Sequence, residues 1–143
     1  MHGVYEHHLT VAPEDLDTNG HANNVEYVRW MQDAAVHHSD SIGGTAATLA
    51  QGATWVVRAH RIEYLRPAFA GEGILVLTWV ATLRRVRSLR RYLMVRHKGR
   101  EILARGETDW VFVDRSTGRP RSIPPEVADH YVLIDEKDAP DGF

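Results

Sequence analysis

One stretch of the sequence has a helical repeat, whereas most of the rest has the pattern of β-strands. This stretch constrains the fold more than any other feature. Residues 24–43, NVEYVRWMQDAAVHHSDSIG, bring apolar or aromatic side chains to every third or fourth position. Such spacing is typical of a helix with one buried face. We predict a single amphipathic helix of about four to five turns, capped by Asn23 or Asn24 and ended near Gly43 and Gly44. Its buried stripe is expected to hold Tyr27, Val28, Met31, Ala34, Ala35 and His38.

Strand patterns fill most of the remaining sequence, separated by turn residues at nearly regular spacing. A first strand is predicted at 4–12 and a short second helix at 45–52. Beyond them the chain alternates between apolar runs and short turns. This indicates four long strands, at 54–66, 73–85, 88–99 and 100–114. They are followed by a turn region at 115–124 and a short final helix at 124–131.

One long helix followed by antiparallel strands predicts an α+β fold. The helix is too long and apolar to lie on the surface, so we expect the sheet to wrap around it. One sheet edge would remain open, which favours pairing with a second copy of the chain. With 143 residues the chain fits one domain, expected at 1–134 and followed by a polar, poorly ordered C-terminal tail at 135–143.

Composition argues against several classes of function and location. The net charge of -2 gives the whole molecule no strong attraction to nucleic acid or to an anionic membrane. The absence of cysteine excludes disulfides, thiolate catalysis and cysteine-ligated metals. Because the run 74–83 is too short to span a bilayer and the first residues lack the apolar core of a signal peptide, we expect a cytoplasmic protein. The histidines show no spacing typical of a metal site, so no metal is expected.

The densest cluster of reactive side chains is the loop DLDTNGHANN, residues 15–24, directly before the predicted helix. If this segment were extended, Asp17, Asn19 and His21 would point the same way and face one cleft. A carboxylate there can act as a general base or nucleophile, and the first N–H groups of the helix can polarise a carbonyl oxygen. Gly20 would let the backbone approach a ligand closely. The same residue types are also typical of plain turns and helix caps, which is the alternative interpretation.

The segment DLDTNGHANNVEYVRW resembles the signature of the hot-dog-fold acyl thioesterases, in particular the 4-hydroxybenzoyl-CoA thioesterase family and its acyl-CoA and acyl-ACP relatives. That family has a D-x-D-x-x-G loop before a central helix and a tyrosine soon after, matched here by Asp15, Asp17, Gly20 and Tyr27. The plant-type acyl-ACP thioesterases have D-x-N-x-H-V-N-N, matched by Asp17, Asn19, His21, Asn23 and Asn24, with Ala22 in place of the usual valine. Two later segments, RIEYLRPAFAGEGILV and VFVDRSTGRPRSIP, are also similar to the family.

This resemblance implies a hot-dog fold, in which an antiparallel sheet wraps one central helix, and a thioester hydrolase activity that needs no cofactor. It implies that Asp17 attacks the thioester carbonyl or activates a water, while Asn19 and His21 orient the carboxylate or the water. The implied substrate-binding residues are Gly20, Asn23, Asn24 and Tyr27, with a backbone N–H near Asn23 or Asn24 on the carbonyl oxygen. The implied substrate is an acyl-CoA or acyl carrier protein thioester, and the implied assembly is a homodimer or homotetramer with its site at the subunit interface.

Several alternatives remain open. The basic run RRVRSLRRY, residues 84–92, is either a solvated hairpin or a grip for the phosphates of coenzyme A or a carrier-protein arm, with nucleic-acid binding a weaker possibility. A second hot-dog subfamily uses a glutamate within the helix, but neither Glu26 nor Asp33 lies clearly on the inner face. The chain could also be a non-catalytic hot-dog protein that binds an acyl ligand or a partner, although the intact set at positions 17, 19 and 21 argues against this.

Overall fold

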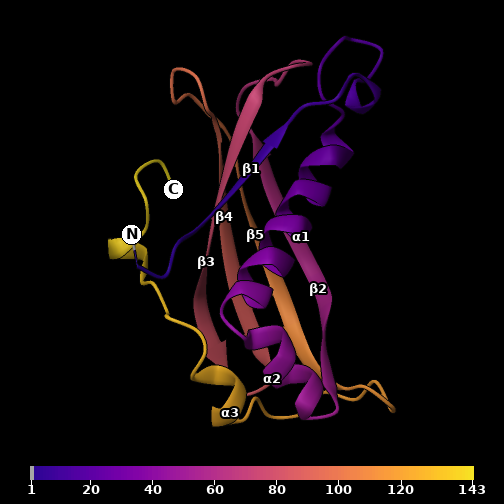
Figure 1. The fold of residues 1–143 in the computed structure, drawn as a ribbon, viewed down its shortest axis with the longest axis vertical. Helices are drawn as coiled ribbons and strands as arrows, with labels where there is room; N and C mark the ends of the chain where they lie inside the picture. The colour runs from indigo at the N-terminus through magenta and orange to yellow at the C-terminus, as the bar shows by residue number, and fades with distance from the viewer. Residues whose placement is uncertain (1) are drawn as a thin grey trace.

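A long helix lies across one face of a five-stranded antiparallel sheet in the computed structural model, which describes residues 2–143 (Figure 1). The strands are β1 Tyr5–Thr10, β2 Ala53–Tyr64, β3 Gly73–Arg84, β4 Arg87–Arg96 and β5 Ile102–Asp114, in the spatial order β1-β3-β4-β5-β2. The helices are α1 Asn24–Ser41, α2 Gly44–Ala50 and α3 Pro125–Ala128, with short 3-10 helices at Pro13–Asp15 and Glu136–Asp138. The predicted α+β class is confirmed. No helix within residues 2–143 is both long and apolar enough to cross a membrane.

Helix α1 begins and ends for local reasons. The Asn23 Oδ1 accepts a hydrogen bond from the Val25 N–H at 3.1 Å, so the structure selects Asn23 as the cap. At the other end, Gly43 turns the chain with a φ of 81°, a left-handed angle that glycine adopts without strain. Trp30 joins the predicted buried stripe, and Val28 is only half-buried. The buried residues are Tyr27, Trp30, Met31, Ala34, Ala35 and His38.

Small residues let α1 approach the sheet closely. Ala34 and Ala35 are buried on the helix, and Gly106 lies below it on β5. A Cβ atom at Gly106 would come within 2.9 Å of Met31 Sδ, so a larger residue would force the methionine to move. The core between helix and sheet continues along the strands through Ile74, Val76, Tyr92, Met94, Leu103 and Ala104.

The sheet has two outer edges, β1 and β2, rather than the single open edge expected. Strand β1 has 6 residues, whereas β2 has 12. Short edge strands are poor templates for pairing, and long ones are good templates. Val56 of β2 is 44% exposed, and a bulge lies between Val57 and Ala59. Strand β2 is therefore the longer of the two sheet edges.

The C-terminal residues 135–143, predicted as a polar tail, include Ala139 and Phe143, which pack against an apolar cluster on the outer face of the sheet. The Phe143 ring meets the Trp79 ring edge-on, with centroids 5.3 Å apart. The Arg91 guanidinium lies 5.2 Å from the centroid of the Phe143 ring. Trp79 belongs to a second apolar cluster, separate from the α1 core, and it is fully buried there. The end of the C-terminal segment therefore covers part of this outer cluster.

Candidate active site

The loop before α1 folds into a tight turn. Leu16 and Ala22 pair as an isolated antiparallel bridge, and the Asp17 N–H donates to the His21 carbonyl at 2.7 Å. The chain therefore reverses direction between these residues. The prediction that Asp17, Asn19 and His21 alternate along an extended segment is wrong, because the bridge draws the two ends of the segment together.

This turn holds the Asp17 carboxylate by one oxygen. Its Oδ1 accepts hydrogen bonds from the backbone N–H groups of Asn19 at 2.9 Å and His21 at 3.2 Å. Its Oδ2 accepts no hydrogen bond from any of residues 2–143, and the residue is half-buried. The loop therefore orients a carboxylate through backbone donors and leaves one carboxylate oxygen available.

A cavity of about 200 Å³ opens beside the turn. Of the residues singled out in the sequence, Asp17, His21, Asn24 and Tyr27 line this cavity, whereas Asn19, Gly20 and Asn23 do not. The remaining wall consists of Ala22, Tyr64, Leu65, Arg66 and Pro67. The His21 ring is held edge-on against Phe69, with centroids 5.3 Å apart. The fold thus brings the carboxylate, an imidazole and the start of α1 to one cavity.

The first turn of α1 leaves one backbone donor without an acceptor among residues 2–143. The Asn23 N–H donates to the Asp15 carbonyl at 2.7 Å, and the Val25 N–H donates to Asn23 Oδ1. The Glu26 N–H donates to the Asn23 carbonyl at 2.9 Å. Across the described part of the chain, the Asn24 N–H has no acceptor, and Asn24 lines the cavity. Of the two donors considered in the sequence, only Asn24 is free for a ligand, at the positive end of the helix dipole.

Tyr64 is the site residue that sequence reasoning missed. Its hydroxyl donates to the Asn24 carbonyl at 2.9 Å, and its ring meets Tyr27 in a T-shape with centroids 5.1 Å apart. Burial raises the pKa of both phenols, which keeps them neutral. No local pattern links a residue at the end of β2 to the start of α1, so only the family-like segment around it could have drawn attention to Tyr64.

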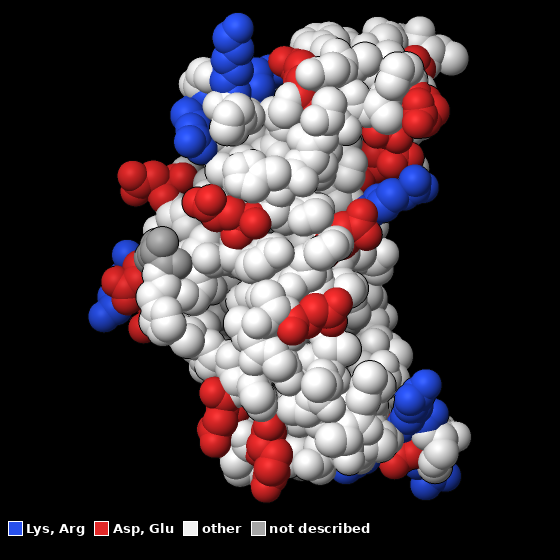
Figure 2. Space-filling model, in the orientation of Figure 1, with Lys and Arg blue, Asp and Glu red and all other residues white. Residues whose placement is uncertain are grey.

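The basic run at 84–92 does not form one patch. Arg87 pairs with Asp109, and Arg91 Nε lies 3.6 Å from a Glu107 carboxylate oxygen, whereas Arg90 is buried. On the face in Figure 2, Lys and Arg side chains gather mainly toward the two ends, with acidic side chains spread between them. The paired arginines fit the hairpin interpretation better than a continuous phosphate grip.

The other candidate groups lie elsewhere. Glu26 forms an ion pair with Arg29 at 3.5 Å, and Asp33 is exposed. Neither acid lines the cavity beside Asp17. Residues 2–143 contain no group of three or more His, Asp or Glu arranged to hold a metal ion.

A family model described as the thioesterase-like superfamily matches residues 11–130. Among curated relatives, the chloroplastic oleoyl-acyl carrier protein thioesterase 1 of Arabidopsis thaliana is 23% identical over 138 residues, which cover 91% of this chain and 38% of the relative. The chloroplastic palmitoyl-acyl carrier protein thioesterase of Cuphea hookeriana is 24% identical over 131 residues, which cover 87% of this chain and 32% of the relative. The chain therefore spans about a third of the length of these relatives.

Solved structures share the fold. A DHNA-CoA thioesterase from Staphylococcus aureus has a TM-score of 0.80 at 22% identity, with 89% of this chain and 87% of that chain covered. An acyl-ACP thioesterase from Bacteroides thetaiotaomicron has a TM-score of 0.83 at 20% identity, with 93% of this chain and 54% of that chain covered. These likenesses confirm the hot-dog fold predicted from the loop signature.

Proposed function

The chain belongs to the thioesterase-like superfamily, and from this premise we propose that it hydrolyses acyl thioesters of coenzyme A or acyl carrier protein. One observation carries the proposal: Asp17, whose oriented carboxylate has a free oxygen, and Asn24, whose N–H has no acceptor among residues 2–143, line the same cavity. Thioester hydrolysis needs a group that generates or provides the nucleophile and a donor for the carbonyl oxygen. The proposal assigns the first role to Asp17 and the second to the Asn24 N–H.

In the proposed reaction, the thioester carbonyl oxygen accepts a hydrogen bond from the Asn24 N–H. Negative charge that develops on this oxygen is stabilised there by the positive end of α1. Asp17 removes a proton from a water that attacks the carbonyl carbon, or attacks that carbon itself to form an anhydride that water then hydrolyses. In either route the C–S bond breaks, the thiolate takes up a proton, and the free acid leaves.

The other residues of the proposed site position the reacting groups or form the wall around them. Asn19 and His21 hold the Asp17 carboxylate through their backbone N–H groups, and the proposal assigns to the His21 ring, which belongs to a residue that lines the cavity, the role of orienting the water. Tyr27 and Tyr64 form the wall beside the thioester. Asn23 caps α1 and so keeps the neighbouring N–H in place.

The direct test is thiol release from a panel of aliphatic and aromatic acyl-CoA and acyl carrier protein thioesters. We expect turnover of at least one member, and its identity names the substrate class. A protein that binds panel members without releasing thiol from any of them would contradict the proposal and favour the non-catalytic alternative.

We also propose that the protein forms a homodimer, or a homotetramer of such dimers, through the open edge of β2. Exposed apolar side chains lie on this strand and on two helices. Val56 of β2 is 44% exposed, Leu49 of α2 is 49% exposed, and Val36 of α1 is 51% exposed. A long edge strand with apolar neighbours is a template for pairing with an identical strand. Two copies of β2 related by a twofold axis would pair in antiparallel fashion.

Replacing Val56 with aspartate is expected to weaken dimerisation by at least about tenfold, because an unpaired carboxylate would be buried in the interface. Sedimentation at several protein concentrations measures the change. The matched control is Val132→Asp, since Val132 is also exposed (40%) but lies after α3 and outside the β2 edge. A dimer of unchanged strength in the Val56→Asp protein would rule out this interface.

Replacing Gly20 with alanine is expected to lower activity by displacing the Asp17 turn. Gly20 has a φ of 78°, and nothing lies within 4 Å of a Cβ built there, so the cost is backbone strain of about 1–2 kcal/mol. Gly118 has a φ of 73° with the same open space, and it does not line the cavity. Unfolding measurements should show similar losses for Gly20→Ala and Gly118→Ala, with reduced kcat only in Gly20→Ala. Equal kcat in both variants would show that the turn does not position the catalytic group.

A further inference from the structure

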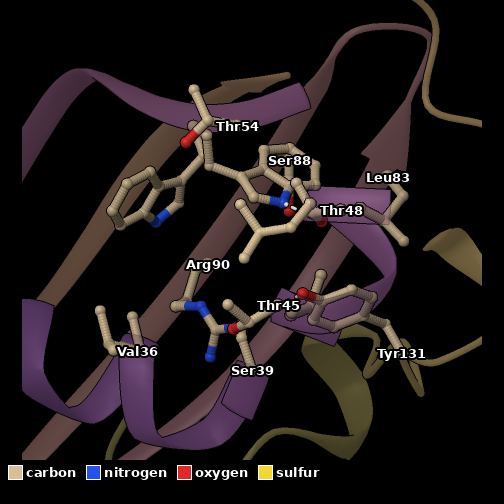
Figure 3. Close-up of a pocket in the computed structure, with 14 residues that line it drawn as sticks. Val36, Ser39, Thr45, Thr48, Thr54, Leu83, Ser88, Arg90 and Tyr131 are labelled. Atoms are coloured by element: carbon tan, nitrogen blue, oxygen red, sulfur yellow. Dashed lines mark hydrogen bonds between the residues drawn. The ribbon is translucent and has the colours of Figure 1, made fainter. Parts of the chain in front are cut away.

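A second cavity of about 200 Å³ lies between α1, α2 and the sheet, and it shares no lining residue with the Asp17 cavity (Figure 3). Val36 of α1 and Leu49 of α2 line it and are half-exposed, so the cavity opens to the surface. Figure 3 shows Arg90 extending from β4 into the space between Val36 and Ser39. A buried residue with a charged group therefore forms part of the wall of a mostly apolar cavity.

Arg90 is buried among neutral partners. It is 4% exposed, and its Nη1 donates to His38 Nδ1 at 2.8 Å and to Thr78 Oγ1 at 3.2 Å. Its Nη2 donates more weakly to Ser39 Oγ at 3.4 Å. Burial and the nearby Arg90 charge lower the pKa of His38 to about 4, so the imidazole is neutral and accepts this hydrogen bond at neutral pH. The guanidinium keeps its positive charge, because arginine does not deprotonate in proteins.

The other arginines of β4 show how unusual this environment is. Arg87 pairs with Asp109, Arg91 with Glu107, and Arg96 with Glu72 and Glu101. None of the ion pairs among residues 2–143 includes Arg90. A buried charge without a counter-charge is costly, and hydroxyl groups alone could have linked α1 to the sheet at lower cost. The absence of an anionic partner for Arg90 is explained if a ligand supplies the negative charge.

The cavity has room for a small organic group. A cavity of about 150 Å³ holds a benzene ring, so about 200 Å³ accepts one ring or a short chain. Aliphatic side chains such as Ala35, Val80 and Leu83 form much of its wall. An occupant would thus be apolar along its length and would carry an acceptor oxygen at the end that meets Arg90.

Dimerisation through β2 would place this cavity beside the reactive loop of the second copy. The cavity is lined by Thr54 and Trp55 at the start of β2, and the Asp17 cavity is lined by Tyr64 and Leu65 at its end. In an antiparallel pair of identical strands, the start of one strand lies opposite the end of the other. One substrate could then place its thioester at one subunit and its acyl group in the other.

We propose that this cavity receives the acyl group of the substrate and that Arg90 selects acyl groups with a distal carboxylate over those that end in hydrocarbon. The assignment rests on the thioesterase function and the dimer proposed above. The carboxylate would supply the counter-charge that the fold leaves out, in a charge-assisted hydrogen bond to the guanidinium.

The test uses a matched pair of ligands that need not react. Monomethyl adipate carries a carboxylate at one end, and dimethyl adipate has the same chain without the charge. Trp55 and Trp110 line the cavity, so tryptophan fluorescence reports binding independently of catalysis. We expect monomethyl adipate to bind wild type at least about tenfold more tightly than dimethyl adipate. The kcat/KM of adipyl-CoA over hexanoyl-CoA should show a preference in the same direction.

Variants then assign the preference to Arg90. Arg90→Met should remove it, Arg90→Lys should retain part of it, and the neighbouring Arg91→Met should leave it unchanged. Circular dichroism checks that each variant folds, and if Arg90→Met does not fold, the ligand pair in wild type still decides the matter. Equal binding of the two esters to wild type, or a preference that survives in Arg90→Met, would overturn the inference. If monomethyl adipate is preferred but no thioester is hydrolysed, the function proposed above fails, whereas Arg90 as a carboxylate receptor stands.

Discussion

Replacing Asp17 with asparagine is expected to lower kcat for thioester hydrolysis by at least about a hundredfold, the size expected when a general base is lost. Asparagine keeps the shape of the side chain, and its Oδ1 can still accept the N–H groups of Asn19 and His21 that hold Asp17 Oδ1 at 2.9 and 3.2 Å. The variant therefore retains the turn and loses the charge. Because the cavity and the Asn24 N–H remain, we expect substrate binding to change much less than turnover. Steady-state thiol release, with kcat and KM separated, measures this difference.

Asp15→Asn is the matched control for this substitution. Asp15 lies in the same loop, and its Oδ2 accepts a hydrogen bond from the Ala12 N–H at 3.0 Å, which asparagine can preserve through its own carbonyl oxygen. Asp15 does not line the Asp17 cavity. We expect Asp15→Asn to keep most of the activity. Comparable losses in the two variants would indicate a general effect of loop charge, and undiminished activity in Asp17→Asn would remove Asp17 from the mechanism.

Replacing Trp79 with alanine is expected to lower the free energy of unfolding by about 3–5 kcal/mol, the range for a large aromatic side chain removed from a core. Trp79 is fully buried, although it belongs to the outer cluster and not to the α1 core. Its neighbours there include Leu93, Ile134 and Phe143, so the substitution would leave a cavity under the C-terminal segment. Urea unfolding followed by circular dichroism gives the change.

The variant Phe143→Ala measures how much the C-terminal segment contributes to the free energy of unfolding, apart from the contribution of the sheet. Phe143 is only half-buried, and its ring covers Trp79 from outside, so we expect a smaller loss of stability than for Trp79→Ala. A loss below about 1 kcal/mol for Trp79→Ala would mean that the outer cluster does not belong to the cooperative core. Such a small loss would also support the prediction, made from the sequence, that residues 135–143 form a polar, poorly ordered tail.

The contrast between Arg90 and Arg91 shows a limit of sequence reasoning. Strand alternation separates these neighbours onto opposite faces. It does not say which face meets the helix, because both faces of β4 carry apolar residues. Arg90 shares the inner face with Tyr92 and Met94, and Arg91 shares the outer face with Leu93 and Val95. Only the packing of α1 on one side of the sheet decided which arginine became a buried, unpaired charge.

The ten residues of the loop before α1 also show which features the sequence indicated and which only the tertiary structure decided. Its residue types indicated a carboxylate and a helix start, and its resemblance to a family indicated the chemistry. The extended geometry assumed for it was wrong, since the Asp17 N–H to His21 carbonyl bond closes a turn. The free Asn24 N–H and the Tyr64 contact depend on atoms from the loop, α1 and β2 together. No spacing within one segment could reveal them.

The sequence by itself determined the features that depend on neighbours along the chain. Helix α1 follows from an apolar repeat that acts within a few residues, although the sequence left both Asn23 and Asn24 open as its cap, and the strands follow from apolar runs between turns. The tertiary structure alone decided which donor stays free, which arginine is buried and what covers Trp79. These depend on groups far apart in the chain, whose contacts exist only once the helix has packed on the sheet.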